Sequence, residues 1–201
     1  MQNEQTLKNY EHYLSLITAE IEKMFEAQKE YICCKNGCSL CCEQGMYPFS
    51  EIEFEYIKQG FVDLPENIQQ IVKSNCQKLA NKVGNGDFLY ECPFLIDGSC
   101  SVYKYRGLIC RTFGLISENA SGKLTIPYCA EEGLNYSKVY DKNTHRILEG
   151  SVKYEGYSTL PKAYNLSRYN LMFGIVKSLN FDWGETKLLI SWLLEYFDTK
   201  A

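Results

Sequence analysis

Cysteine is the residue type in this chain whose number and spacing could do chemistry. The sequence has ten cysteines, and all of them lie within residues 33–129. Residues 34–42 read CKNGCSLCC, so a short loop containing a glycine brings several sulfurs onto one side of the backbone. Thiolates are soft donors, and a tetrahedral ion or an iron–sulfur cluster needs about four of them within bonding distance. This spacing favours metal chelation.

Disulfide bonds are the alternative explanation for a cysteine cluster. They are common in small secreted domains and rare in a reducing compartment. The sequence starts Met-Gln-Asn-Glu, without the basic-then-apolar order of an export signal. We therefore expect a cytoplasmic protein with reduced thiols, and a reduced cluster indicates a metal site.

A second group of cysteines follows at Cys92, Cys100, Cys110 and Cys129. The Asp97-Gly98 pair predicts a tight turn that lets Cys92 and Cys100 face each other. The ten-residue step from Cys100 to Cys110 leaves room for a helical turn.

Two arginines, Arg106 and Arg111, flank Cys110. A four-thiolate centre is a net anion, so guanidinium groups beside it could neutralise charge and tune its potential. The alternative is that both arginines pair with surface carboxylates.

Helical patterns occur on both sides of the cysteines. Apolar residues at steps of three and four predict an amphipathic helix over 6–28. Ser50 and Glu53 form a capping box for a helix that we expect to end at Gly60. A third helix should open at Pro65 and bury an apolar face. The residues expected on that face are Ile68, Ile71, Val72, Cys76, Leu79 and Val83.

The rest of the chain divides into a turn-rich part and a helical end. Residues 88–130 contain short apolar runs broken by Asp97-Gly98 and Ser121-Gly122, which predicts short strands. Two closing helices are expected, one from Pro161 to about residue 179 and one capped by Asp182 with Glu185.

These patterns predict a mainly α fold. We expect one helical domain over residues 1–201, with a loop-rich cysteine metal-binding centre and a few short β-strands. The motif region is 33–129, flanked by helices within 1–32 and 161–199.

Composition excludes several function classes. The formal charge is −4, and no Lys/Arg run could follow a phosphate backbone, so nucleic acid is not an expected partner. Apolar stretches are too short for a membrane helix, so no membrane partner is expected. The two histidines, His12 and His145, have no cysteine beside them in sequence and are read as surface residues. Acid–base or nucleophilic catalysis therefore has little support.

The order of the cysteine elements resembles a known family. Cys-x3-Cys-x2-Cys-Cys, Cys-Pro-Phe-Leu and Cys-x2-Tyr-x2-Arg-x3-Cys-Arg follow one another as in the YkgJ-type cysteine-cluster family of zinc- or iron-chelating proteins. The match covers about residues 34–129. Position 107 departs from it, because Gly107 stands where the family usually has proline. The ligands that the resemblance implies are Cys34, Cys38, Cys41, Cys42, Cys92, Cys100, Cys110 and Cys129.

Two cysteines fall outside this pattern. Cys76 lies on the apolar face of its predicted helix and is expected in the core. Whether Cys33 is a ligand is undecided, since a shift of one residue would put it in the place of Cys34. Two tyrosines near predicted ligands, Tyr103 and Tyr128, could donate hydrogen bonds to sulfur.

The metal is either iron, as an iron–sulfur cluster, or zinc. Neighbouring side chains diverge, so the Cys41-Cys42 pair fits a multinuclear centre better than one tetrahedral ion, which favours iron–sulfur. The expected partner is the metal or cluster itself, with a protein substrate or redox partner as a further possibility.

Two enzyme readings are open alongside metal binding. Cys34-x3-Cys38-x2-Cys41 also has the spacing of radical S-adenosylmethionine enzymes, but no run of alternating strands and helices follows it. Relatives of the resembled family include flagellin lysine N-methylases, which makes a metalloenzyme acting on protein lysine the alternative function. S-adenosylmethionine would be a cofactor only under that alternative, and the usual glycine-rich loop is missing, Gly84-Asn-Gly86-Asp87 being the nearest stretch.

Overall fold

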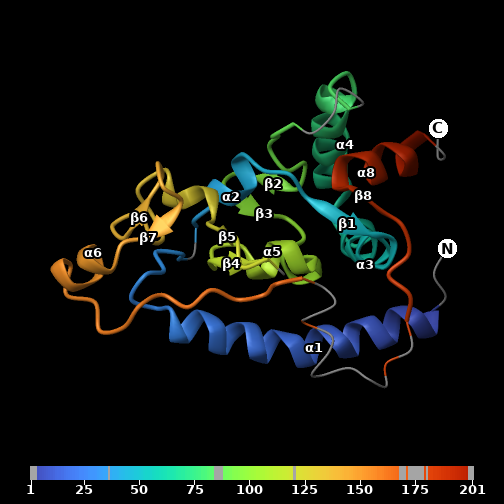
Figure 1. Ribbon diagram of the computed structural model, residues 1–201. Coiled ribbons are helices and arrows are strands. Elements are labelled where there is room, and N and C mark those ends of the chain that lie inside the picture. Colours follow the sequence, from blue (N-terminus) through green and yellow to red (C-terminus); the bar gives the residue numbers. More distant parts are fainter. Residues whose placement is uncertain are drawn as a thin grey trace. The chain divides into compact units, whose positions relative to one another are not determined.

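The computed structural model describes residues 4–35, 37–83, 88–119, 121–167, 171, 179 and 181–198. The fold is mainly α with a few short strands, as the sequence predicts (Figure 1). The chain divides into two compact units. Unit 1 comprises Met1–His12, Gly37–Arg111 and Leu179–Ala201, and unit 2 comprises Tyr13–Asn36 and Thr112–Ser178. The single-domain organisation remains a prediction.

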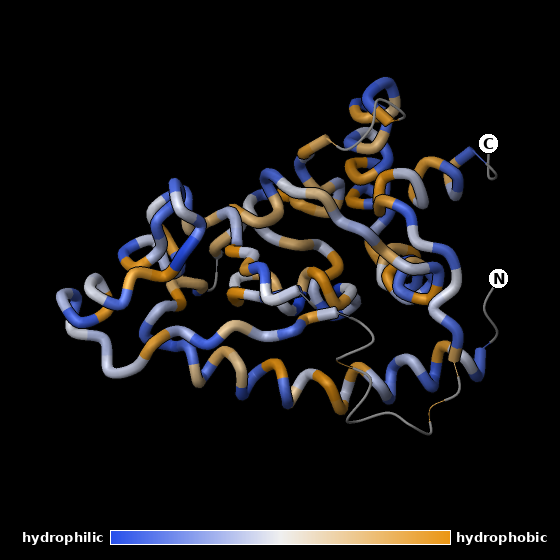
Figure 2. The backbone as a smooth tube through the Cα atoms, in the orientation of Figure 1, coloured by the Kyte–Doolittle hydropathy of each residue, from blue (hydrophilic) through white to orange (hydrophobic). Residues whose placement is uncertain are grey.

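Helix α1, Glu4–Ala27, confirms the first predicted helix. Its stripe of apolar residues is buried, as at Leu14, Ile17 and Ile21, and Figure 2 shows hydrophobic and hydrophilic residues alternating along it. Burial of this stripe, rather than helix propensity alone, stabilises a helix of this kind.

In unit 1, the chain passes from helix α2, Leu40–Glu43, to strand β1, Pro48–Ser50, and helix α3, Glu51–Val62. Ser50 and Glu53 form the predicted capping box. The predicted helix end at Gly60 is wrong, because α3 continues to Val62. Glycine is required at position 60 for packing, since an added Cβ would come within 2.3 Å of the Tyr105 ring.

Helices α4, Glu66–Ala80, and α8, Leu189–Asp198, pack against each other in unit 1 (Figure 1). Pro65 precedes α4 as predicted, and Val72 and Cys76 are fully buried. The prediction for Ile71 is wrong, since it is 40% exposed. Ile71 lies beside the buried stripe of α4 and not on it.

The second closing helix begins later than predicted. Residues Thr186–Leu188 form strand β8, which pairs antiparallel with β1, and the helix starts only at Leu189. Asp182 accepts a hydrogen bond from the Gly184 amide in a turn, so it does not cap the helix. Pairing with residues 48–50 makes residues 186–188 a strand instead of the first turn of the helix.

Short hairpins follow the predicted turns. In unit 1, β2, Leu95–Ile96, pairs with β3, Ser99–Cys100, and both turn residues have positive φ, 50° at Asp97 and 71° at Gly98. The 3-10 helix η1, Tyr103–Tyr105, and helix α5, Leu108–Thr112, come next.

Unit 2 contains two further hairpins. Strand β4, Ser117–Glu118, pairs with β5, Leu124–Thr125, around the predicted Ser121-Gly122 turn, and β6, Tyr140–Asp141, pairs with β7, Arg146–Ile147. Between and after them lie the 3-10 helix η2, Tyr128–Ala130, and helix α6, Glu149–Tyr154. The core of this unit is small and rich in tyrosine. Its buried members are Tyr31, Ile116, Tyr136, Val139 and Val152.

The predicted helix from Pro161 is wrong over residues 161–167, which are not helical. Tyr164 instead forms a parallel bridge with Ser117. Leu171 is helical and buried, and the remainder of that prediction lies outside the described residues, as does the Gly84-Asn-Gly86-Asp87 stretch. Within the described residues, no helix combines the length and the apolar character needed to cross a membrane.

Candidate metal centre

The predicted ligands fall into both units. Unit 1 holds Cys38, Cys41, Cys42, Cys92, Cys100 and Cys110, and unit 2 holds Cys34 and Cys129. Most of the predicted set therefore belongs to one compact part of the chain, and each group is described within its own unit.

Five thiols of unit 1 lie close enough to influence one another's ionisation. They are Cys41, Cys42, Cys92, Cys100 and Cys110. Stretches that are distant in sequence meet here, because the Cys92 amide donates a 2.8 Å hydrogen bond to the Cys42 carbonyl. Cys92 is buried, and the other four thiols are half-buried. Cys92 is part of the unit 1 core, which also contains Phe49 and Phe94, and Cys42, Cys100 and Cys110 pack against it.

The adjacent pair on α2 is strongly coupled. A hydrogen bond with Cys42, with a smaller contribution from Arg106, lowers the pKa of the Cys41 thiol to about 7. The same hydrogen bond raises the pKa of Cys42, since Cys42 keeps the shared proton. One sulfur of the pair is thus prepared to ionise near neutral pH, which is the form that binds a metal.

The other three thiols resist ionisation. Burial raises the pKa of Cys92 to about 12 and that of Cys110 well above its ordinary value, and it also raises the pKa of Cys100. Neighbouring thiols add to each shift. Thiolates at these positions need a cation beside them, because burial penalises the charged form.

Arg106 supplies positive charge at this cluster. It lowers the pKa values of Cys41, Cys100 and Cys110. Its guanidinium stacks 3.5 Å from the centre of the Tyr103 ring and donates to the Tyr103 carbonyl at 3.0 Å. Tyr103 therefore orients the arginine, where the sequence predicted a hydrogen bond to sulfur.

Arg111 has a different role from Arg106. It donates hydrogen bonds to the Arg106 carbonyl at 2.8 Å and to the Lys104 carbonyl at 2.9 Å. These bonds hold the loop that carries Arg106. Arg106 therefore acts on the thiols, and Arg111 supports Arg106.

Tyr47 is a buried residue of the site that sequence reasoning missed. It is 3% exposed, and its hydroxyl donates to the Cys41 carbonyl at 2.9 Å. Burial raises the pKa of Tyr47, and Cys92, Cys42 and Cys110 raise it further. An added Cβ at Gly45 would lie 2.8 Å from the Tyr47 ring, so glycine at 45 allows this close approach.

Glu53 is the second missed residue. Its side chain is buried, and one carboxylate oxygen accepts the Leu108 amide at 2.9 Å while the other accepts the Ser50 amide. The start of α3 is thereby joined to the start of α5, which carries Cys110. Its signal in the sequence was the capping box, which gave no hint of the link to residue 108.

The surroundings of residue 107 explain why this chain has glycine where the resembled family usually has proline. A Cβ at this position would come within 2.9 Å of the Phe49 ring and 3.1 Å of the Glu53 carboxylate. Glycine therefore fits where the chain passes the buried carboxylate.

The remaining predicted ligands differ in exposure. Cys38 and Cys34 are exposed, and Cys129 is buried on η2 in unit 2. Cys76 is buried in the core, as predicted, and burial raises its pKa to about 12. Tyr128 could donate to sulfur on sequence grounds, and in the structure its hydroxyl donates to Glu132 at 2.7 Å.

The chemistry of the unit 1 donors suits a thiophilic metal. Soft sulfur ligands, partial burial and a nearby guanidinium are the features that zinc–thiolate and iron–sulfur centres use. Among the described residues, no group of three or more His, Cys, Asp or Glu side chains is already placed to hold a metal ion. Metal binding here thus requires the thiols to turn towards a common point.

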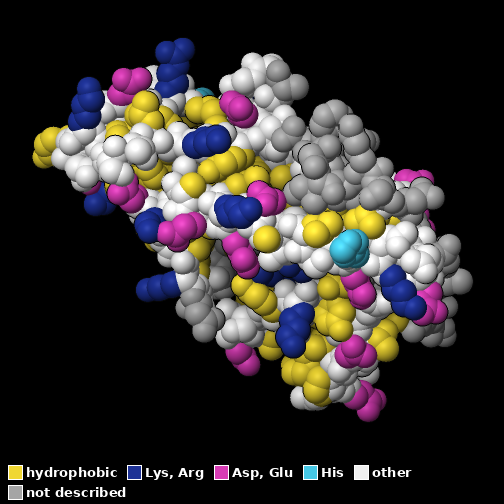
Figure 3. Space-filling view, turned by 90° about the horizontal axis from the view of Figure 1, so that it is seen from below, with side chains coloured by type: hydrophobic (Ala, Val, Ile, Leu, Met, Phe, Trp, Pro, Cys, Tyr) yellow, Lys and Arg dark blue, Asp and Glu magenta, His cyan; other side chains and the backbone are white. Residues whose placement is uncertain are grey.

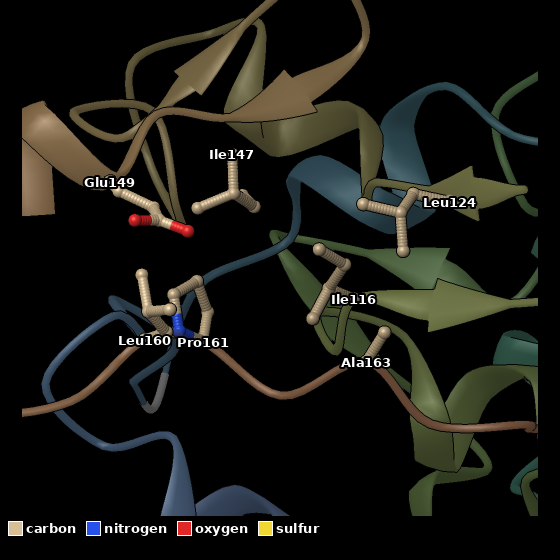
Figure 4. A pocket seen from close by; sticks show the side chains of 7 residues that line it. All are labelled: Ile116, Leu124, Ile147, Glu149, Leu160, Pro161 and Ala163. Carbon is tan, nitrogen blue, oxygen red and sulfur yellow. The ribbon is translucent and has the colours of Figure 1, made fainter. Parts of the chain in front are cut away.

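Other surface features lie apart from these thiols. Unit 2 has a hollow of about 180 Å³ lined by apolar side chains and Glu149 (Figure 4). No cysteine lines it. His12 and His145 are exposed, as predicted. On the face in Figure 3, positive and negative side chains are interspersed among apolar ones.

A family model covers the cysteine-bearing segment. Residues 33–130 match the family CxxCxxCC, described as a "putative zinc- or iron-chelating domain". This segment of the chain is similar to that family. The CxxCxxCC match spans both cysteine groups and confirms the resemblance seen in the sequence. No curated protein and no solved structure matches the chain.

Proposed function

We propose that this chain binds iron or zinc through a thiolate centre in unit 1. The proposed ligands there come from Cys41, Cys42, Cys92, Cys100 and Cys110, with Cys38 on the adjoining loop. The observation that carries the proposal is the meeting of separate stretches of the chain, where the Cys92 amide donates to the Cys42 carbonyl at 2.8 Å and Cys42, Cys100 and Cys110 pack against the same core as Cys92. Within unit 2, Cys34 and Cys129 are proposed as metal-binding thiols from the family pattern.

Charge balance supports this assignment. Gathering thiolates in a half-buried place is costly without a compensating cation, and Arg106 alone does not balance several of them. A bound metal ion or cluster would provide the missing positive charge. The buried thiols with raised pKa values, such as Cys92, would release their protons when it binds.

We favour an iron–sulfur cluster over a single zinc ion. Five thiols influence one another in unit 1, whereas one tetrahedral zinc ion takes about four ligands. The adjacent Cys41 and Cys42 can serve different atoms of a multinuclear centre more readily than one ion. An iron–sulfur cluster would supply one-electron transfer, and zinc would supply a structural cross-link.

Metal and sulfide analysis tests the proposal. The protein is produced without a metal-affinity tag and purified anaerobically, and iron, zinc, acid-labile sulfide and visible absorbance are measured together. Iron and sulfide in equal amounts with visible absorbance are expected. Stoichiometric zinc without sulfide would overturn the iron–sulfur choice, and a preparation that cannot be loaded with either metal would overturn the function.

Matched variants locate the centre. Cys41→Ser should lower the metal content, because it removes the thiol with the lowered pKa. Cys33→Ser is the control, since Cys33 is exposed and outside the predicted ligand set. Equal metal loss in both variants would count against the assignment of ligands.

The alternative of a metalloenzyme acting on protein lysine remains a prediction. Titration calorimetry with S-adenosylmethionine tests it directly, since a methylase must bind that cofactor. Heat of binding at a single site would favour the enzyme, and its absence would leave metal binding as the function.

A further inference from the structure

We propose that Asn135 is a positioning residue that selects Cys34, and not its neighbour Cys33, as a metal-binding thiolate. The inference rests on the proposed function and goes beyond the family pattern, which names cysteines only. It also decides between the two positions that the sequence left open.

Asn135 uses its whole side-chain amide on the Cys33-Cys34 segment and its surroundings. It is 1% exposed. Its Oδ1 accepts the Cys33 amide hydrogen at 2.6 Å, and its Nδ2 donates to the Cys34 Sγ at 3.3 Å and to the Gly114 carbonyl at 3.0 Å. A buried amide with its donors and acceptor satisfied has one defined orientation.

These contacts treat the two cysteines differently. Cys33 is held through its backbone, which leaves its side chain outside the interaction. Cys34 is held through its sulfur, and a hydrogen-bond donor to a ligand atom fixes the direction in which that ligand faces the metal. Because neighbouring side chains diverge, fixing one sulfur turns the other away.

Gly114 makes room for this arrangement. A Cβ there would lie 3.1 Å from the Asn135 Nδ2 and 3.1 Å from the Cys34 Sγ, and the residue has a φ of +105°. Glycine therefore meets both the steric and the backbone requirement at this point. The sulfur of Cys34 is enclosed on one side by Gly114 and Asn135.

The segment around Asn135 is anchored on both sides. The Leu134 amide donates to the carbonyl of Cys129, a second predicted ligand, at 2.9 Å. The Tyr136 amide donates to the Tyr31 carbonyl, and the two rings stack 5.6 Å apart. Asn135 is thus held by its own backbone neighbours, independently of the thiol that it contacts.

Thiol protection by zinc in the unaltered protein is the first test. Reduced protein is treated with iodoacetamide over a range of Zn²⁺ concentrations, and fragment mass spectrometry reads each cysteine separately. Both Cys33 and Cys34 are exposed, so both should react without metal. We expect zinc to protect Cys34 while Cys33 still reacts. Equal protection of the two, or protection of Cys33 alone, would overturn the inference.

Variants of Asn135 are the second test. Asn135→Asp keeps the acceptor for the Cys33 amide and removes the N–H donors, and Asn135→Leu removes both. In each, the zinc concentration that half-protects Cys34 should rise about 10–100-fold, and the preference over Cys33 should disappear. Retention of the preference in both variants would show that Asn135 does not select the thiol.

Two controls separate selection from damage. Asn119→Asp makes the same chemical change in unit 2, but among the described residues the Asn119 side chain accepts its hydrogen bonds through Oδ1, which aspartate retains. Zinc protection of Cys34 should be unchanged in it. The buried Cys76 reports folding, since it reacts only when the core opens.

Failure of the inference differs from failure of the proposed function. If neither zinc nor iron supplied with sulfide protects any cysteine of the unaltered protein, the proposed function falls. If zinc protects Cys41 but does not distinguish Cys34 from Cys33, the function stands and the role of Asn135 falls.

Discussion

The hydroxyl of Tyr47 is a small feature with a large expected effect on the thiols beside it. It donates to the carbonyl of Cys41, in a four-residue helix that has few bonds of its own. Short helices have little intrinsic stability in water. The direction of the Cys41 and Cys42 side chains therefore depends on contacts such as this one.

Tyr47→Phe removes this hydrogen bond together with a longer one, at 3.4 Å, to the Tyr90 carbonyl. We expect the unfolding free energy of the metal-free protein to fall by about 1 kcal/mol. The zinc concentration that half-protects Cys41 should rise about tenfold, because the support of a ligand is lost. Denaturant unfolding and alkylation with mass spectrometry measure the two effects.

Tyr31→Phe is the matched control for Tyr47→Phe. The Tyr31 hydroxyl is also buried and donates to a backbone carbonyl, that of Thr159. Tyr31→Phe should lower the unfolding free energy by an amount similar to that of Tyr47→Phe and leave zinc protection of Cys41 unchanged. A similar loss of protection in both variants would contradict the role given to Tyr47.

At the level of secondary structure, one buried carboxylate connects two elements. Glu53 caps the start of α3 and also accepts the first amide of α5, at Leu108. Cys110 lies two residues further along α5. The position of that thiol thus depends on a helix more than fifty residues away in sequence.

Glu53→Gln should destabilise the protein by about 2 kcal/mol, since an amide group would face buried N–H groups that lose their acceptor. Urea unfolding measures this change. Glu66→Gln, in the exposed first turn of α4, should cost only about 0.5 kcal/mol, the usual value of a helix-end charge. Equal losses would show that the buried bonds contribute no more than the charge.

Element types were predictable where a local pattern met no competing partner, and some types and several boundaries were not. The α1 periodicity, the Ser50–Glu53 box and the Asp97-Gly98 turn are local signals, and all three hold. The helix expected from Asp182 failed because residues 186–188 pair with a strand about 140 positions earlier in the chain. Such a partner is invisible in the local sequence.

At the level of the whole molecule, burial of Cys76 makes the unfolding free energy of the protein depend on pH in the alkaline range. The ordinary thiol pKa is 9.0, and burial raises that of folded Cys76 to about 12. Between these values the folded state holds a proton that the unfolded chain has released. Stability is therefore complete below pH 9 and falls as the pH rises towards 12, by roughly 4 kcal/mol at most for a pKa difference of about 3.

Cys76→Val should make this decline shallower in the metal-free protein, and urea unfolding between pH 8 and about pH 11 measures it. Val72→Ala is the control, since it damages the same buried face of α4 without changing a thiol. It should lower stability by a similar amount at every pH. An unchanged slope in Cys76→Val would show that Cys76 is not the source.

Metal removal should lower the stability of the whole protein, because binding occurs only in the folded state. Zinc at about 100 times its Kd should raise the unfolding free energy by about 2.7 kcal/mol, and a chelator should reverse this. Cys38→Ser should weaken the gain while changing metal-free stability by less than about 0.5 kcal/mol, since Cys38 is exposed. An undiminished gain would remove Cys38 from the ligands.

The sequence by itself determined which chemistry this protein offers. Cysteine number, spacing and order indicated soft metal ligation, the family and the mainly α fold, because these features are written in residue types and local patterns. Tertiary structure alone decided which thiols of unit 1 influence one another, that Arg106 is the cation beside them, that Tyr47 and Glu53 bond to the elements carrying them, and that Asn135 contacts Cys34 in unit 2. Those relations depend on burial and on hydrogen bonds between distant segments, which arise only when the chain is folded.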